Sequence, residues 1–184
     1  MTFHPVVRAG FLAAAWTAIF VPPAAAQEHS ETRPHATFAV PAAIKAEHER
    51  IHADLQALTA LPGKTGDAAR GVAAVLHEHF QREEELALPP LGLLAPLAED
   101  RPTPQVREVL ALTDRLKAEM PRMLREHKAI LQALGELERA AKAERHAQGT
   151  QFADELKAHA QTEEQVLYPA AILVGQYVKV KFPR

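Results

Sequence analysis

Cysteine is missing from the 184-residue sequence, which excludes disulfides, iron–sulfur clusters, thiolate zinc sites and a cysteine nucleophile. Aromatic residues make up only 5% of the chain while hydrophobic residues make up 47%, and this reliance on alanine and leucine favours helix over strand. The formal net charge is only −2, so no excess of one sign indicates nucleic acid or an anionic membrane as a partner. A chain of this length can bury the core of one ordinary domain.

An apolar stretch near the N-terminus has the form of a signal peptide. Arg8 precedes an apolar run of about a dozen residues, too short to span a bilayer stably. Pro22-Pro23 ends the run, and residues 24–26 are alanines of the kind that precede a cleavage site. We therefore expect residues 1–26 to be removed on export, to the periplasm if the source is a Gram-negative bacterium; an uncleaved N-terminal anchor is the alternative.

Residues 27–40 are polar and lack periodicity, which predicts a flexible linker. From there on, apolar positions are spaced alternately by four and three in four stretches, the pattern of packed helices. These stretches cover residues 44–58, 72–86, 109–137 and 152–173. The predicted fold class is therefore all-α: an up-down-up-down antiparallel four-helix bundle over residues 41–178, with a short C-terminal helical extension and a tail at 179–184.

Turn-forming residues predict the helix ends. Asp67 is the expected N-cap of the second helix, and Thr103-Pro104 the expected start of the third. Pro121 should kink or split the third helix, and Pro169 should bend the fourth before its extension.

An internal repeat divides the chain into two related helical hairpins. Its first motif, Glu47-His48-x-x-Ile51, returns as Glu126-His127-x-x-Ile130. Its second motif, His79-x-Gln81-x-Glu83-Glu84, returns as His159-x-Gln161-x-Glu163-Glu164. Each hairpin therefore supplies one histidine from its first helix and a His-x-x-x-Glu pair from its second.

Six polar residues of the repeat lie on the apolar stripe of their helix, that is, at positions of the four-and-three spacing. Leu, Ile, Val, Met or Phe fills most of the other positions of these stripes. An ionised glutamate in a bundle core costs several kcal/mol unless it is compensated. A metal pair would compensate the whole set, because residues i and i+4 of a helix are offset by only roughly 40° and 6 Å, close enough to serve one ion. The predicted metal ligands are His48, His79, Glu83, His127, His159 and Glu163.

The ligands can face one another only if each turn lies midway between the two histidines of its hairpin. This requirement predicts where the second turn lies. The midpoint between His48 and His79 falls in the obvious turn at Gly63, whereas the midpoint between His127 and His159 is residue 143. The second turn should therefore lie near residues 144–146, with Gly149 inside the fourth helix. A turn centred on Gly149 would separate the two histidines by about 15 Å.

Other polar residues near the stripes have simpler interpretations. Glu84 and Glu164 are expected to be solvated, His77 to point away from the site, and His146 to lie in the turn. His52 lies one turn beyond His48 and is a candidate extra ligand, although the repeat has no counterpart for it. Tyr168 could tune a metal, but packing in the core is the preferred interpretation.

The pattern Glu-His-x-x-Ile, then His-x-x-x-Glu-Glu, ending in Leu-x-Pro or Leu-Tyr-Pro and present twice, resembles the hemerythrin-like HHE family over residues 41–178. The resemblance implies a four-helix bundle with an oxygen-linked non-haem di-iron centre. It also implies that the four histidines are terminal ligands and that Glu83 and Glu163 bridge the ions. Oxygen-carrying hemerythrins have a fifth histidine where this chain has Met123, which argues against simple reversible oxygen carriage.

The predicted cofactor is a pair of iron ions, with manganese or zinc less favoured, since histidine and carboxylate ligands alone suit all three. Three functions follow as hypotheses. The chain binds or senses oxygen, peroxide or nitric oxide; or it is a small di-iron oxidase or peroxidase; or it is a metal-free helical interaction protein. Whether it is an enzyme is left open. The expected partner is a small diatomic or peroxide ligand, with no nucleic acid and no membrane after signal cleavage.

Overall fold

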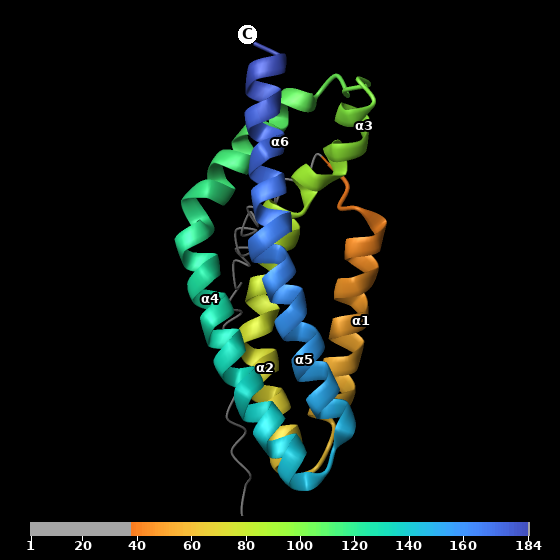
Figure 1. Cartoon of the computed structure of the whole chain (residues 1–184), viewed down its shortest axis with the longest axis vertical. Coiled ribbons are helices and arrows are strands. Elements are labelled where there is room, and N and C mark those ends of the chain that lie inside the picture. The colour runs from red at the N-terminus through yellow and green to blue at the C-terminus, as the bar shows by residue number, and fades with distance from the viewer. Residues whose placement is uncertain (1–37, 184) are drawn as a thin grey trace, which may run out of the picture. The chain divides into compact units, whose positions relative to one another are not determined.

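The computed structural model describes residues 38–183, so the predicted signal peptide and most of the predicted linker lie outside the described residues. Within this range all regular structure is helical and no strand occurs, which confirms the all-helical fold class. The long helices that carry the repeat lie side by side in a bundle (Figure 1). They are α1 (Ala42–Thr59), α2 (Gly63–Arg82), α4 (Val109–Glu144) and α5 (Ala147–Thr162). No helix in this part of the chain has the length and apolar character to cross a membrane.

The turn between α4 and α5 lies where the metal hypothesis required it. Helix α4 ends at Glu144, and Arg145 adopts a left-handed conformation with φ 61° before α5 begins at Ala147. Gly149 is buried inside α5, where a Cβ would lie 2.8 Å from the Cβ of Ala141 on α4. The predicted turn at residues 144–146 is confirmed, and it brings α4 and α5 into register.

The start of α2 differs from the prediction, because a carboxylate from the other turn caps it. The side chain of Glu144 accepts hydrogen bonds from the backbone N–H of Lys64 (2.8 Å), and from the backbone N–H (2.9 Å) and hydroxyl (2.7 Å) of Thr65. These bonds satisfy N–H groups that a helix leaves free at its first turn. Helix α2 therefore begins at Gly63, and the predicted N-cap Asp67 lies inside it. Gly63 has a φ of 81°, and a Cβ there would lie 2.8 Å from Glu144 Oε1.

Two π-helical turns follow α2 and α5 at equivalent places in the repeat. They are η1 (Glu83–Ala87) and η4 (Glu163–Leu167), and each is followed within two residues by a proline, Pro89 or Pro169. Proline lacks the N–H that an α-helix needs and its ring clashes with the preceding turn, so a wider turn before it relieves the strain. After η4 the chain continues as α6 (Tyr168–Lys181).

A crossover between α2 and α4 contains short helical pieces that the sequence pattern does not predict. They are η2 (Pro89–Leu93), α3 (Leu94–Ala98) and η3 (Val106–Glu108). Thr103-Pro104 begins a turn, in which the Thr103 carbonyl accepts a hydrogen bond from Val106 N–H, so α4 starts only at Val109. Pro121 does not split α4, which bows along its length in Figure 1.

The apolar core is interrupted at the level of the predicted ligands. One buried cluster includes Ile51, Leu76, Ile130 and Leu156 and fills the end of the bundle near the two turns. A second cluster contains Leu88, Leu116, Met123 and Tyr168, and a third joins Phe38 to α6 and the crossover. Along each helix the predicted ligands lie between residues of the first two clusters, except that Phe80 of the first cluster follows His79. Apolar layers therefore lie at both ends of the site.

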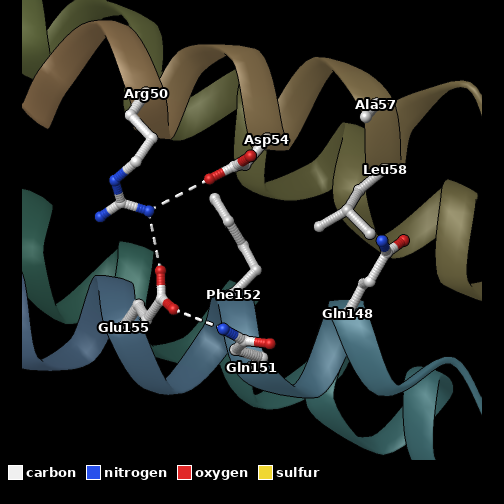
Figure 2. A pocket seen from close by; sticks show the side chains of 8 residues that line it. All are labelled: Arg50, Asp54, Ala57, Leu58, Gln148, Gln151, Phe152 and Glu155. Atoms are coloured by element: carbon white, nitrogen blue, oxygen red, sulfur yellow. Dashed lines mark hydrogen bonds and ion pairs between the residues drawn. The ribbon is translucent and has the colours of Figure 1, made fainter. Parts of the chain in front are cut away.

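A surface pocket of about 270 Å³ marks the contact between α1 and α5. Figure 2 shows Arg50 of α1 bridging Asp54 on its own helix (3.1 Å) and Glu155 on α5 (2.8 Å), above Phe152. All three charged side chains are largely exposed, so their ion pairs contribute little to stability. The Arg50–Glu155 pair joins the exposed faces of the two helices that carry His48 and His159.

The cap by Glu144 predicts an acid dependence of stability. Hydrogen bonds from the Thr65 hydroxyl and from the backbone of Thr65 and Lys64 lower the pKa of Glu144 to about 2, from an ordinary value of 4.5. Because the folded-state pKa is depressed, the stabilisation is complete above about pH 4.5 and is lost as the pH falls towards 2. Glu144→Gln should flatten this part of the curve in urea unfolding measured across that range.

Glu136→Gln, at an exposed carboxylate on the same helix, serves as the matched control and should leave the acid dependence as in wild type. Parallel stability curves for Glu144→Gln and wild type would contradict the capping role.

Candidate metal centre

The bundle brings all six predicted ligands to one level. Each of the four long helices contributes one histidine, and the two π-helical turns contribute the carboxylates. No side chain of this cluster is more than 5% exposed: His48, His79, Glu83, His127, His159 and Glu163. Polar groups at this depth need partners, so the atoms that face one another decide what the cluster can do.

The side chains form two groups that share one carboxylate. His79, Glu83, His127 and Glu163 place one nitrogen or oxygen each within 4.8 Å of the others, and His48 and His159 do the same with Glu163. Each group draws its histidines from different hairpins: the His48 and His159 rings lie 5.2 Å apart between centroids, and those of His79 and His127 lie 4.5 Å apart. Neither hairpin alone could therefore form either group.

Both carboxylates face the two histidine pairs at once. Oε1 of Glu163 lies 2.9 Å from His159 Nε2 and 3.6 Å from His48 Nε2, while its Oε2 lies 3.4 Å from His127 Nε2. Oε1 of Glu83 lies 3.4 Å from His79 Nε2, and its Oε2 lies 3.9 Å from His48 Nε2. This is the orientation that a carboxylate needs to bridge two ions.

Several inward-facing atoms have no hydrogen bond among the described residues. They are Nε2 of His48, His79 and His159, Oε2 of Glu83 and Oε1 of Glu163. Even the 2.9 Å approach of His159 to Glu163 lacks hydrogen-bond alignment. More than nine in ten buried polar groups of native proteins have a hydrogen-bond partner. Five unpaired atoms that point to the same place therefore indicate a common partner that binds there. All five are lone-pair donors, and the partner they fit is a metal cation.

A second set of glutamates lies against the outer nitrogens of the histidines and hydrogen-bonds three of them. Nδ1 of His79, His127 and His159 lies 3.0, 2.7 and 3.1 Å from a carboxylate oxygen of Glu126, Glu164 and Glu47 respectively, and Nδ1 of His48 lies 3.6 Å from Glu84. A carboxylate accepts the Nδ1–H proton, which orients the ring and leaves the Nε2 lone pair pointing inward. This carboxylate–histidine arrangement is typical of metal ligands.

Sequence reasoning missed this outer set. Glu164 was expected to be only solvated; its side chain is 38% exposed, but it also binds His127. Glu84, 53% exposed, likewise lies beside His48. The signal was present in the repeat, since these glutamates directly precede a ligand histidine or directly follow a ligand glutamate in both halves. Their partners lie on other helices, which periodicity alone does not reveal.

One member of the outer set is itself anchored by arginines. Glu126 lies 3.3 Å from both Nε and Nη2 of Arg82 and 2.9 Å from Nε of Arg122. Partial burial would raise the pKa of Glu126, but His79 and the two arginines lower it. This carboxylate therefore stays ionised and holds His79 in place.

The two central carboxyls have opposite pKa shifts in the metal-free protein. Burial, together with the nearby charge of Glu163, raises the pKa of Glu83. Burial would also raise the pKa of Glu163, but the imidazoles of His127, His159 and His48 hold it well below its usual range. Although burial opposes it, Glu163 and Glu47 raise the pKa of His159 to about 9. A proton on His159 thus offsets the negative charge of Glu163 in the metal-free protein. A metal ion that binds at His159 would have to displace this proton.

Tyr168 breaks the symmetry of the repeat at the site. Its hydroxyl donates a hydrogen bond to Oε1 of Glu83 and lies 3.2 Å from Nε2 of His127. The matching position in the first hairpin is Leu88, which has no donor. Tyr168 is fully buried, and burial together with Glu83 raises the pKa of its phenol, which therefore stays protonated. It both packs in the core, as predicted, and contacts the cluster.

The remaining histidines of residues 38–183 lie outside the cluster. His52 is exposed and contacts the edge of Phe80 at 5.1 Å between centroids, so it is not a further member. His77 is exposed and bonds Gln81 at 3.1 Å, and His146 lies in the α4–α5 turn, both as predicted. Met123, at the place of the carriers' fifth histidine, is buried in the apolar cluster around Tyr168.

A helical bundle with a buried cluster of histidine and glutamate has the features of a metal-binding protein. Residues 118–180 match the family described as hemerythrin HHE cation binding domain, and the resemblance is confirmed over this segment. The segment contains His127, His159 and Glu163, and the repeat relates it to the first hairpin. No curated protein and no solved structure matches the chain.

The outer carboxylates predict an effect on metal affinity. Glu164→Gln should weaken metal binding by about 10- to 100-fold, because a neutral amide is a poorer acceptor for His127 Nδ1–H. Titration of the metal-free protein with Fe²⁺ or Zn²⁺ would measure this. Glu85→Gln, at an exposed glutamate of η1, should bind as wild type; equal losses in both variants would contradict the assigned role.

Proposed function

We propose that this chain is a hemerythrin-like protein that holds two iron ions and uses them to bind or sense oxygen or a related small molecule such as peroxide or nitric oxide. The observation that supports the metal pair is the set of five buried, unpaired nitrogen and oxygen atoms converging between two bridging-oriented carboxylates. The family match over residues 118–180 supports a cation as their partner.

In this proposal the histidines are terminal ligands in two pairs. His48 and His159 hold one ion, and His79 and His127 hold the other, each through Nε2. Glu83 and Glu163 would bridge the ions, since the oxygens of each carboxylate face both histidine pairs.

In this proposal the four long helices form the up-down-up-down antiparallel bundle of hemerythrin-like proteins. The order along the chain supports alternating directions: the first apolar cluster follows the histidine on α1 and α4 (Ile51, Ile130) and precedes it on α2 and α5 (Leu76, Leu156).

The ligand count favours small-molecule binding at the ions. Two histidines and two carboxylate oxygens give four protein donors per ion, fewer than the six that iron commonly accepts, so positions remain for an external ligand. Bound iron would supply electrons to such a ligand. The residues of this chain shape the surroundings, since the buried apolar layers exclude water. The Tyr168 hydroxyl has one proton, which it donates to Glu83 here and would have to redirect to a ligand bound beside it.

We also propose that the protein works outside the cytoplasm. The support is the signal-peptide pattern of residues 1–26, with cleavage after Ala26. N-terminal sequencing of the protein recovered from the periplasm or medium should begin at Gln27.

Metal analysis tests the central proposal. Protein purified under iron-replete conditions should carry two irons per chain, and Glu83→Gln or Glu163→Gln should lose them, because each removes a bridging charge from between the ions. Glu78→Gln, at an exposed residue of α2, should keep both. A wild-type content of iron, manganese and zinc that is near zero would leave the metal-free interaction protein as the function. Full iron in both bridging variants would overturn the ligand assignment.

The role of Tyr168 can be measured with azide as a probe of the open positions. Tyr168→Phe should keep both irons but bind azide up to about tenfold more weakly, since a hydrogen bond contributes about 1 kcal/mol. Tyr177→Phe, on the exposed face of α6, should bind azide as wild type. Absorption spectra with and without azide report both metal content and affinity. Unchanged affinity in Tyr168→Phe would contradict a role for its hydroxyl at the ligand positions.

The same spectra separate binding from catalysis. A stable oxygen-dependent spectrum favours a binding or sensing protein, whereas sustained consumption of peroxide with a reductant favours the oxidase or peroxidase alternative.

A further inference from the structure

The two metal positions differ in the number of protein donors that converge on them. At one position, nitrogens of His79 and His127 and an oxygen from each of Glu83 and Glu163 all lie within 4.8 Å of one another. At the other position the remaining two histidines meet this limit with Glu163 alone. We call these the four-donor position and the three-donor position. Each donor adds a bond to the ion, so the four-donor position should hold an ion more tightly.

The support of the histidine rings differs in the same direction. At the four-donor position, outer carboxylates hydrogen-bond both rings, at 3.0 Å for His79 and 2.7 Å for His127. At the three-donor position only His159 has such a bond, at 3.1 Å. Neither ring nitrogen of His48 has a hydrogen bond within residues 38–183, and its ring stacks on Phe80 at 4.1 Å between centroids. A ring without an outer acceptor is oriented less firmly and is a weaker ligand.

The carboxylates behind the rings are also held unequally. Glu126, behind His79, is bound by Arg82 and Arg122 and is only 22% exposed. Glu47 has the same role at the three-donor position, but it is 45% exposed and pairs with no lysine or arginine of the described residues. The acceptor at the four-donor position is therefore the more rigid of the two.

Three departures from the repeat account for this asymmetry. Each pairs a polar residue at the four-donor position with a smaller or apolar residue at the equivalent place in the other hairpin. Two of the polar residues bind Glu126, and the third donates a hydrogen bond to Glu83. The pairs are Arg82 and Thr162, Arg122 and Ala43, and Tyr168 and Leu88.

One charge effect acts in the opposite direction. Glu47 and Glu84 keep their full charge at the three-donor position, whereas the arginines offset the charge of Glu126. However, Glu47 and Glu84 are 45% and 53% exposed, so water and salt screen their attraction for a cation. The extra donor and the fixed rings act directly at the ion and should outweigh it.

We propose that the two positions fill in order: the four-donor position binds the first ion, and the three-donor position binds a second, more weakly held and exchangeable ion. The inference rests on the proposed metal pair. It gives the chain a stable state with one ion, and the metal supply decides whether the second ion is present. Chemistry that needs both ions therefore follows the metal supply.

Calorimetric titration of the metal-free chain with Zn²⁺ tests the order of filling. We expect two steps of one ion each, with affinities that differ by about tenfold or more. His48→Gln should lose the weaker step and keep the tighter one. His127→Gln, at the equivalent histidine of the repeat, should instead weaken the tighter step. Unchanged helical circular dichroism shows that both variants fold.

Nuclear magnetic resonance of isotope-labelled imidazoles locates each ion in the wild-type chain. The first equivalent of Zn²⁺ should move the Nε2 signals of His79 and His127 to the zinc-bound range, and the second equivalent those of His48 and His159. Movement of the His48 and His159 signals with the first equivalent would overturn the proposed order.

The role of the arginines has a separate test. Arg82→Thr combined with Arg122→Ala gives Glu126 the surroundings that the repeat gives Glu47. The double variant should weaken the tighter step by about tenfold and leave the weaker step unchanged. Arg125→Ala, at an exposed arginine of α4, should leave both steps as in wild type. Equal weakening of both steps in the double variant would contradict a role at one position.

Failure of this inference differs from failure of the metal pair. Two ions bound with equal affinity, or equal effects of His48→Gln and His127→Gln, would overturn the order of filling and leave the metal pair in place. A wild-type chain that binds neither Zn²⁺ nor Fe²⁺ would overturn the metal pair, and the order of filling with it.

Discussion

Burial of Glu83 and Glu163 between apolar layers is the constraint on which the rest of the structure depends. A carboxylate at this depth must be neutralised or paired, and its neighbours here are imidazoles rather than lysine or arginine side chains. Imidazole can carry either a proton or a metal ion at the same nitrogen. The buried carboxylates therefore need a proton or a metal ion on the neighbouring imidazoles. Which of the two is bound depends on pH and on metal supply.

The outer glutamates extend this constraint across the helices. Glu47 on α1 binds His159 on α5, and Glu164 in η4 binds His127 on α4. Each contact joins two helices while it fixes the direction of one ring. Structural support and ligand orientation are thus carried by the same residues. This accounts for the Glu-His and Glu-Glu pairs of the motif, in which one residue faces the centre and its neighbour faces an adjacent helix.

Much of the fold was predictable because periodicity fixes which face of each helix is buried. The four stripes, the six cluster residues and the turn before Ala147 all follow from spacing. What failed depended on contacts between distant residues. Glu144, rather than the local Asp67, caps α2. The crossover at residues 89–108 has no regular spacing of apolar residues, so its short helices could not be predicted. The pairing of histidines from different hairpins depends on how the helices pack, which spacing within one helix does not determine.

The exchange of histidines between hairpins has a consequence for how such a protein can arise. Two identical hairpins related by a twofold axis would place the same four histidines and two glutamates around the same centre, so a duplicated and fused hairpin keeps an already working geometry. Fusion then frees each half to change alone. Tyr168 opposite Leu88 is such a change: a polar group on one side of an otherwise symmetric centre, which an assembly of identical halves could not have.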